Sequence, residues 1–204
     1  MARSEAHPQD EHLHTGGRPA SHAVLVVPGL GNSGPGHWQT LWQNVRPDYR
    51  RVTQRDWNDP DLEAWAGAVD EAVQAAGVPC LFIAHSFGCL AVAHRALRYP
   101  GGIAGALLVA PADPQRWNVA REAIAGSPFD FPSILVASET DPWVDIGKAR
   151  NLARQWGSRF VNVGAAGHIN VDAGYGPWPE GKRLFESLRA AVDICTPIPA
   201  DWRW

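Results

Sequence analysis

Stretches of consecutive apolar residues alternate along the chain with stretches in which apolar residues recur every three or four positions. The consecutive stretches have the length of β-strands and are typical of parallel strands buried on both faces. The periodic stretches predict amphipathic helices that cover those faces. The predicted strands are residues 23–28, 51–57, 79–85, 103–110, 133–137 and 160–163, and the predicted helices are residues 38–45, 60–76, 87–99, 146–156 and 180–192.

This alternation predicts an α/β fold: a three-layer sandwich with a mostly parallel sheet of about six strands between helices. The strand at residues 51–57 is more polar than the others, so we expect it at an edge. Crossovers between parallel strands are right-handed, and ligands bind where the strands end. Polar residues directly after strands are therefore the first candidates for a functional site.

The length of 204 residues suits one domain with one substantial core. We expect this domain at residues 23–195, between a disordered tail at residues 1–22 and a short tail at residues 196–204. The first tail contains four irregularly spaced histidines, which favour a solvated segment over a loose metal site. These histidines are His7, His12, His14 and His22.

Composition and charge exclude several classes of protein. The net charge is -3 and no Lys/Arg-rich run occurs, so we expect no nucleic-acid partner. No apolar stretch approaches the roughly 20 residues of a membrane span, and residues 1–21 have no apolar core of a secretion signal. Cys80, Cys89 and Cys195 lack metal-ligand spacing. We therefore expect a cytoplasmic, disulfide-free protein without a metal, either a monomer or a small homo-oligomer.

One predicted strand ends directly on a serine. Residues 81–90 read LFIAHSFGCL: an apolar strand, then Ser86, then the start of a helix. This is the pattern of a nucleophile elbow, a strained turn that exposes a serine hydroxyl at the edge of the sheet. The turn requires small residues two positions before and after the serine, and Ala84 and Gly88 occupy them. A buried strand followed by an N-capping serine would look similar, so the rest of the chain must decide.

An aspartate and a histidine follow two later strands. Asp141 comes after residues 133–137, and His168 comes after residues 160–163 in a loop of small residues. Imidazole can take the proton of a serine, and a carboxylate can fix the imidazole tautomer and stabilise the imidazolium. The chain order serine, aspartate, histidine is that of the α/β-hydrolases. The sequence thus predicts a catalytic triad of Ser86, Asp141 and His168.

Other carboxylates compete for the role of the acid. Glu139 and Asp145 lie in the same loop as Asp141, and Asp113 follows the fourth strand. Asp141 is favoured because it lies nearer the centre of the loop, where the hydrolase fold places its acid. His85 adjoins Ser86, but its side chain should point away from that serine, in a packing or hydrogen-bonding role.

The loop after the first strand is rich in glycine: residues 28–38 read PGLGNSGPGHW. An oxyanion hole needs two preorganised backbone N–H groups. We expect one from Phe87, at the start of a helix, and one from Leu30, with Gly31 as the second choice. A glycine-rich loop can also bind a dinucleotide, but no clean helix start follows and no acidic residue ends a clear second strand. We expect no cofactor.

Three segments resemble the small serine hydrolases that include retinoblastoma-binding protein nine and the bacterial YdeN-like proteins. The segments are residues 27–33 with His37 and Trp38, residues 84–88, and residues 167–170 with Gly174, Gly176, Trp178, Pro179 and Gly181. The resemblance covers residues 23–192. It implies an α/β-hydrolase fold without a large cap domain and a triad that matches the three residues above. The Leu-x-Cys-x-Glu motif for retinoblastoma protein is absent, so that partner is not expected.

We expect a serine hydrolase that acts through an acyl-enzyme on a small-molecule acyl substrate, most simply a carboxylesterase for small or medium acyl esters. An amidase, a thioesterase or a cofactor-free peroxidase would use the same triad, whereas a dehalogenase would need an aspartate at position 86. The alternative of another class is a non-catalytic binding protein on a hydrolase scaffold. Four tryptophans could form the apolar wall of the pocket: Trp57, Trp117, Trp143 and Trp178.

Overall fold

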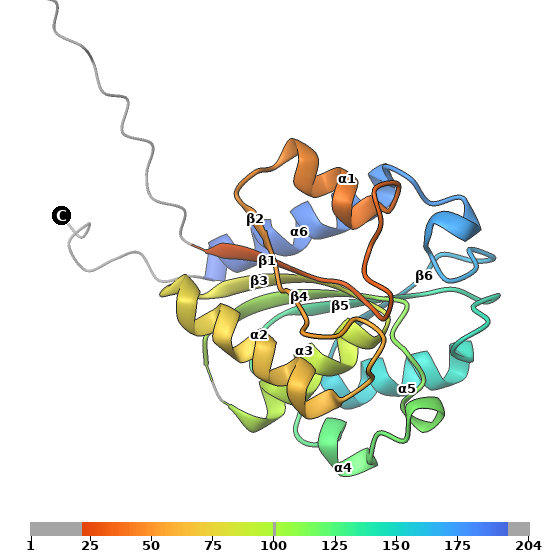
Figure 1. The fold of residues 1–204 in the computed structure, drawn as a ribbon, viewed down its shortest axis with the longest axis horizontal. Helices are drawn as coiled ribbons and strands as arrows, with labels where there is room; N and C mark the ends of the chain where they lie inside the picture. Colours follow the sequence, from red (N-terminus) through yellow and green to blue (C-terminus); the bar gives the residue numbers. More distant parts are fainter. Residues whose placement is uncertain (1–21, 100, 196–204) are drawn as a thin grey trace, which may run out of the picture.

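A six-stranded, fully parallel sheet forms the centre of the computed structural model (Figure 1). The strand order is β2-β1-β3-β4-β5-β6. The strands are β1 (Ala23–Val27), β2 (Tyr49–Arg51), β3 (Cys80–His85), β4 (Ile103–Val109), β5 (Ser133–Ala137) and β6 (Arg159–Asn162). The structure describes residues 22–99 and 101–195. Of the two predicted tails, only His22 belongs to the described residues. The other three tail histidines, His7, His12 and His14, lie outside them.

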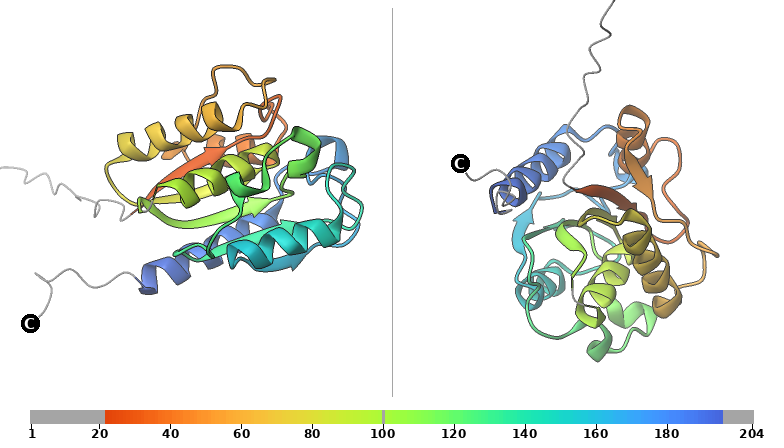
Figure 2. Two further views of the ribbon diagram at one scale, coloured as in Figure 1. Left: turned by 90° about the horizontal axis from the view of Figure 1, so that it is seen from below. Right: turned by 90° about the vertical axis from the view of Figure 1, so that its left-hand side faces the viewer.

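Helices cover both faces of the sheet. Helices α1 (Trp38–Val45) and α6 (Pro179–Cys195) lie on one face, and α2 (Leu62–Ala76), α3 (Phe87–Arg98) and α5 (Ile146–Trp156) lie on the other (Figures 1 and 2). Between β4 and β5 the chain forms only a 3-10 turn (Pro114–Trp117) and the short helix α4 (Arg121–Ile124). The predicted fold class, including the absence of a large cap domain, is confirmed.

The central strands are apolar at nearly every position because both of their faces are buried; His85 at the end of β3 and Ser133 at the start of β5 are polar. In β3, Phe82 belongs to the core beneath α2, α3 and α5, and Ile83 belongs to the core beneath α1 and α6. Both side chains are fully buried. Cys80 and Cys89 are free and buried, and burial raises the pKa of both thiols. They are small core residues, as predicted.

The second strand differs from its prediction. It covers Tyr49–Arg51, whereas the sequence predicted residues 51–57. The Val52 N–H still donates to the Val26 carbonyl, but the chain then leaves the sheet. Val52 and Trp57 suggested a strand because they are apolar, but both belong to the loop that follows β2 and pack against the core.

No helix among the described residues is long and apolar enough to cross a membrane.

Candidate active site

Ser86 lies on a strained turn between β3 and α3. Its backbone has φ 53° and ψ -124°, a conformation that non-glycine residues rarely adopt. A Cβ atom at Gly88 would lie 2.4 Å from the Pro28 carbonyl oxygen, and one at Gly29 would lie 2.7 Å from the Ser86 Cβ. The end of β1 therefore touches the turn, which explains why position 88 requires glycine.

The structure brings Ser86, His168 and Asp141 into one hydrogen-bonded row. The His168 Nε2 atom lies 3.0 Å from the Ser86 Oγ, and its Nδ1 atom lies 2.9 Å from the Asp141 Oδ2. A carboxylate can only accept, so Nδ1 carries the hydrogen and Nε2 is free to accept the serine hydroxyl proton. His168 is 8% exposed and the Asp141 side chain is fully buried, so bulk water competes little for these bonds.

The other candidate carboxylates are engaged elsewhere. Asp145 caps the N-terminus of α5 through the N–H groups of residues 147 and 148. Glu139 accepts a hydrogen bond from Asn162, and Asp113 forms a 2.6 Å ion pair with Lys148. Among the four, Asp141 is thus the carboxylate that hydrogen-bonds to His168.

Several hydrogen bonds fix the loop that carries His168. The Ser138 and Thr140 hydroxyls accept the N–H groups of Ala166 and Gly167 at 2.9 and 3.0 Å. On the other side of His168, the Ile169 carbonyl accepts from the indole of Trp38 at 2.9 Å. The loop after β5 and helix α1 therefore hold the histidine loop from both sides.

The two expected oxyanion donors lie on either side of the contact between β1 and the serine turn. Phe87 begins α3, so its N–H lies at the positive end of the helix. The Gly31 N–H donates to the Trp57 carbonyl at 2.9 Å, whereas the Leu30 N–H has no acceptor within the described part of the chain. This difference favours Leu30 over Gly31 as the second donor.

Two polar residues that the sequence analysis did not single out support the Leu30 loop. The Gln39 amide is fully buried and donates to the carbonyls of Val27, the last residue of β1, and of Ile83 in β3. Arg51 donates to the Asn32 side chain and to the Ser33 carbonyl. Gln39 lies beside the apolar face of α1 rather than within it, so no local pattern in the sequence indicated its role or the partners of Arg51.

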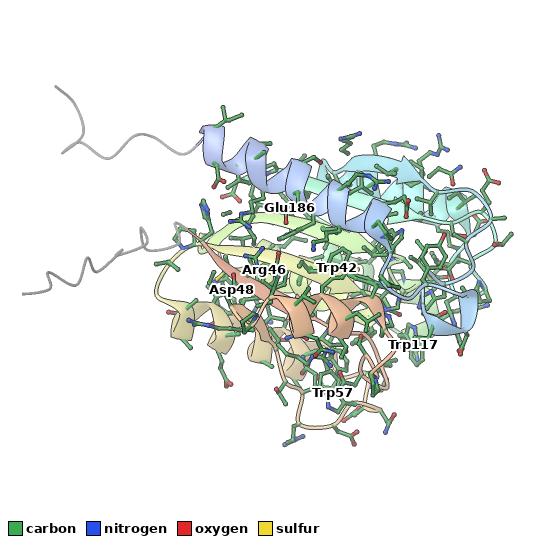
Figure 3. The ribbon with its side chains drawn as sticks, turned by 90° about the horizontal axis from the view of Figure 1, so that it is seen from above. Trp42, Arg46, Asp48, Trp57, Trp117 and Glu186 are labelled. Carbon is green, nitrogen blue, oxygen red and sulfur yellow. The ribbon has the colours of Figure 1, made fainter. Side chains whose placement is uncertain are left out.

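A cavity of about 310 Å³ adjoins Ser86. Trp117 and Trp143 line it, and Figure 3 shows Trp117 on the side where the strands end. The remaining lining residues are Leu30, Asn32, His37, His85, Ala112, His168, Asn170 and Asp172.

Trp57 and Trp178 do not line this cavity, in contrast to the prediction. Trp57 lies in the loop after β2 (Figure 3). Its ring packs edge-on against the ring of Trp65 in α2. Trp178 is 5% exposed and stacks on Trp42 beneath α1 and α6. A Cβ atom at Gly181 would lie 2.2 Å from the Trp178 ring. The Trp-Pro-x-Gly pattern thus reflects packing of α6 against the core.

Two further histidines lie beside His168. Burial, aided by Arg51 and His168, lowers the pKa of His37 to about 4, and burial also lowers the pKa of His85 well below its usual value. Both rings are therefore neutral at pH 7. They add polar surface to the cavity without adding positive charge.

Comparison with known proteins identifies the class. Residues 24–187 match the model of the serine hydrolase family, and the chain belongs to this family. Its fold and family make it a hydrolase.

Solved structures agree with this assignment. A protein described as a YdeN-like hydrolase from Pectobacterium atrosepticum is 40% identical with a TM-score of 0.79, over 83% of this chain and 92% of that chain. The predicted resemblance to YdeN-like proteins is thereby confirmed. The B. subtilis ydeN gene product is 21% identical (TM-score 0.68, 83% and 99% covered), and an esterase from Rhodococcus sp. is 17% identical (TM-score 0.58, 85% and 91% covered). These two share the fold. A comparison with curated proteins gave no match.

Proposed function

We propose that this protein is a carboxylesterase-like serine hydrolase that cleaves small or medium acyl esters through an acyl-enzyme. The observation that carries the proposal is the hydrogen-bonded row of Ser86, His168 and Asp141 at the wall of a cavity. A serine hydroxyl becomes a nucleophile when a positioned base accepts its proton, and a third group orients that base. This row has both features.

The geometry supports the following reaction. The Ser86 Oγ attacks the ester carbonyl carbon while its proton passes to the His168 Nε2. The carbonyl oxygen becomes an oxyanion that the N–H groups of Leu30 and Phe87 bind. As the tetrahedral intermediate collapses, the bond between the carbonyl carbon and the ester oxygen breaks, and the imidazolium of His168 gives its proton to that departing oxygen, which leaves as the alcohol. Water then attacks the acyl-enzyme by the same route, releases the acid and restores Ser86.

The cavity supports small or medium acyl groups. Its volume of about 310 Å³ lies near the lower end of the range for small-molecule sites. Leu30, Ala112, Trp117 and Trp143 supply apolar wall, and no large cap extends it. An acyl chain packed against these four residues would be removed from water, which favours binding.

The test is labelling with a fluorophosphonate probe, followed by mass spectrometry of the adduct. We expect the wild-type protein to carry the adduct on Ser86 and the Ser86→Ala variant to carry none. Hydrolysis of p-nitrophenyl esters of increasing acyl length should be fastest for short chains and should disappear in Ser86→Ala. Circular dichroism and urea unfolding of the variant check that its fold is unchanged.

A folded wild-type protein that forms no adduct and cleaves no ester would overturn the proposal and favour a binding protein on a hydrolase scaffold. An adduct on Ser86 combined with cleavage of thioesters or amides, but not of oxygen esters, would keep the nucleophile and overturn the substrate class. The two measurements therefore separate the mechanism from the substrate.

A further inference from the structure

Three imidazole rings lie in a row beside Ser86. The ring centroids of His37 and His85 are 4.9 Å apart, and those of His85 and His168 are 4.8 Å apart. The middle ring makes a hydrogen bond that the reaction described above does not use: the His85 Nε2 lies 3.0 Å from the backbone carbonyl of His168. The residue before the candidate nucleophile is thus bonded to the candidate base.

The direction of this hydrogen bond follows from its partner. A carbonyl oxygen can only accept, so the hydrogen must be on the His85 Nε2. His85 is 5% exposed and carries a single ring proton, because burial disfavours the charged form. His85 is therefore the tautomer with its hydrogen on Nε2, and this N–H donates to the backbone carbonyl of His168.

The main chain at His168 requires such support. The residues on either side of it, Gly167 and Ile169, have φ values of 53° and 49°. Glycine adopts this region freely, but isoleucine does so only when the surroundings hold it there. The two consecutive carbonyls of this segment accept from buried donors: His168 from His85, and Ile169 from Trp38. Loss of a donor would allow the strained backbone to relax.

We propose that His85 is a positioning residue of the hydrolytic site, an inference that rests on the proposed function. Adjacent residues hold the base at both ends: His85 binds its backbone and Ser86 binds its ring. Because both come from the same strand end, a shift of the His168 loop away from β3 is opposed at two points. The His168 Nε2 is thereby kept at a distance from which it can accept the Ser86 proton.

Two variants separate the donor from the bulk of the ring. In His85→Leu the side chain keeps a similar volume but loses the donor, whereas in His85→Gln an amide N–H reaches about as far as Nε2. We expect His85→Leu to lower kcat and the rate of fluorophosphonate labelling by about 10- to 100-fold, with KM changed less than about threefold, because misplacement of a reacting group costs rate rather than ground-state binding. His85→Gln should retain both within about fivefold.

The matched control is His94→Leu. His94 is also a buried histidine that donates to a backbone carbonyl, that of Ala123, but it lies on α3 outside the cavity. We expect this variant to lose stability in urea while kcat and labelling of the folded protein stay near wild type. The control separates general loss of a buried hydrogen bond from loss of positioning.

The proposal is overturned if folded His85→Leu keeps the wild-type kcat and labelling rate, or if His85→Gln loses as much as His85→Leu. If His85→Leu does not fold, His85→Asn replaces it, since its shorter amide cannot reach the His168 carbonyl; equal rates for His85→Asn and His85→Gln then overturn the proposal. Failure of the proposed function is distinguishable, because the wild-type protein itself would then remain unlabelled.

Discussion

The carboxylate that orients His168 is a question of single residues. Asp141 is hydrogen-bonded to the His168 Nδ1, whereas Asp145 caps α5. Asp141→Asn should lower kcat by about 10³- to 10⁴-fold, because an amide can donate to the ring and favour the wrong tautomer. Asp145→Asn should stay within about threefold of wild type, since asparagine is an equally good N-cap. Steady-state kinetics with one ester substrate checks both, and a larger loss in Asp145→Asn than in Asp141→Asn would contradict the assignment.

The sequence predicted the residues of this row because each one follows a strand, and parallel strands end at one edge of the sheet. Among the residues that this rule selects, the elbow pattern marked Ser86, and the place of Asp141 near the centre of its loop favoured it over the other carboxylates. The tryptophans had no such rule. Trp117 and Trp143 line the cavity, but Trp57 and Trp178 pack elsewhere, since a large apolar ring fits a core as well as a pocket.

At the scale of elements, the helices and buried strands that the sequence predicted well are those with a clear pattern of apolar residues. Helix α2 also has clear signals at both ends: Asp61 caps its start, and Gly77 ends it with φ 65°. Strand β2 was misplaced because it has three residues and lies at an edge, so its pairing with β1 sets its position more than its own pattern does. The bonds of Gln39 and Arg51 also depend on elements that are distant in the sequence.

The contact between β1 and α3 predicts opposite effects for two glycines in helices. A Cβ atom at Gly88 would meet the backbone oxygens of Pro28 and Val27 at 2.4 and 2.6 Å, whereas one at Gly67 in α2 would meet nothing within 4 Å. Gly88→Ala should lower the free energy of unfolding by about 1–3 kcal/mol or more and abolish activity, because β1 carries the Leu30 loop. Gly67→Ala should raise the free energy of unfolding by about 0.5–1 kcal/mol, since alanine loses less conformational entropy than glycine when a helix forms.

Urea unfolding of both variants and the wild-type protein checks this pair. A Gly88→Ala variant with the wild-type midpoint and activity would show that β1 and α3 are not in tight contact. A lower midpoint in Gly67→Ala than in the wild-type protein would show that the exposed face of α2 is not free.

At the scale of the whole molecule, stability should depend on pH through two buried histidines. The pKa of His37 is lowered from 6.5 to about 4, chiefly by burial, and that of His85 is lowered well below 6.5 for the same reason. Between pH 6.5 and about 4 the unfolded chain therefore binds protons that the folded protein does not. The free energy of unfolding is then highest above pH 6.5 and falls as the pH is lowered through this window.

The magnitude and the control follow from the same linkage. One histidine contributes about 1.4 kcal/mol per pH unit at most, and two contribute up to about 2.7 kcal/mol per unit. Urea unfolding from pH 7.5 to 4.5 at constant ionic strength measures the slope. His37 is the N-cap of α1, where its Nδ1 accepts from the Gln39 N–H at 3.3 Å, and asparagine can replace it in that role. The variant His37→Asn combined with His85→Gln should therefore have a smaller slope, with up to two fewer protons taken up on unfolding. An unchanged slope in the double variant would mean that other groups cause the acid sensitivity, and that the two rings are protonated in the folded protein as easily as in the unfolded chain.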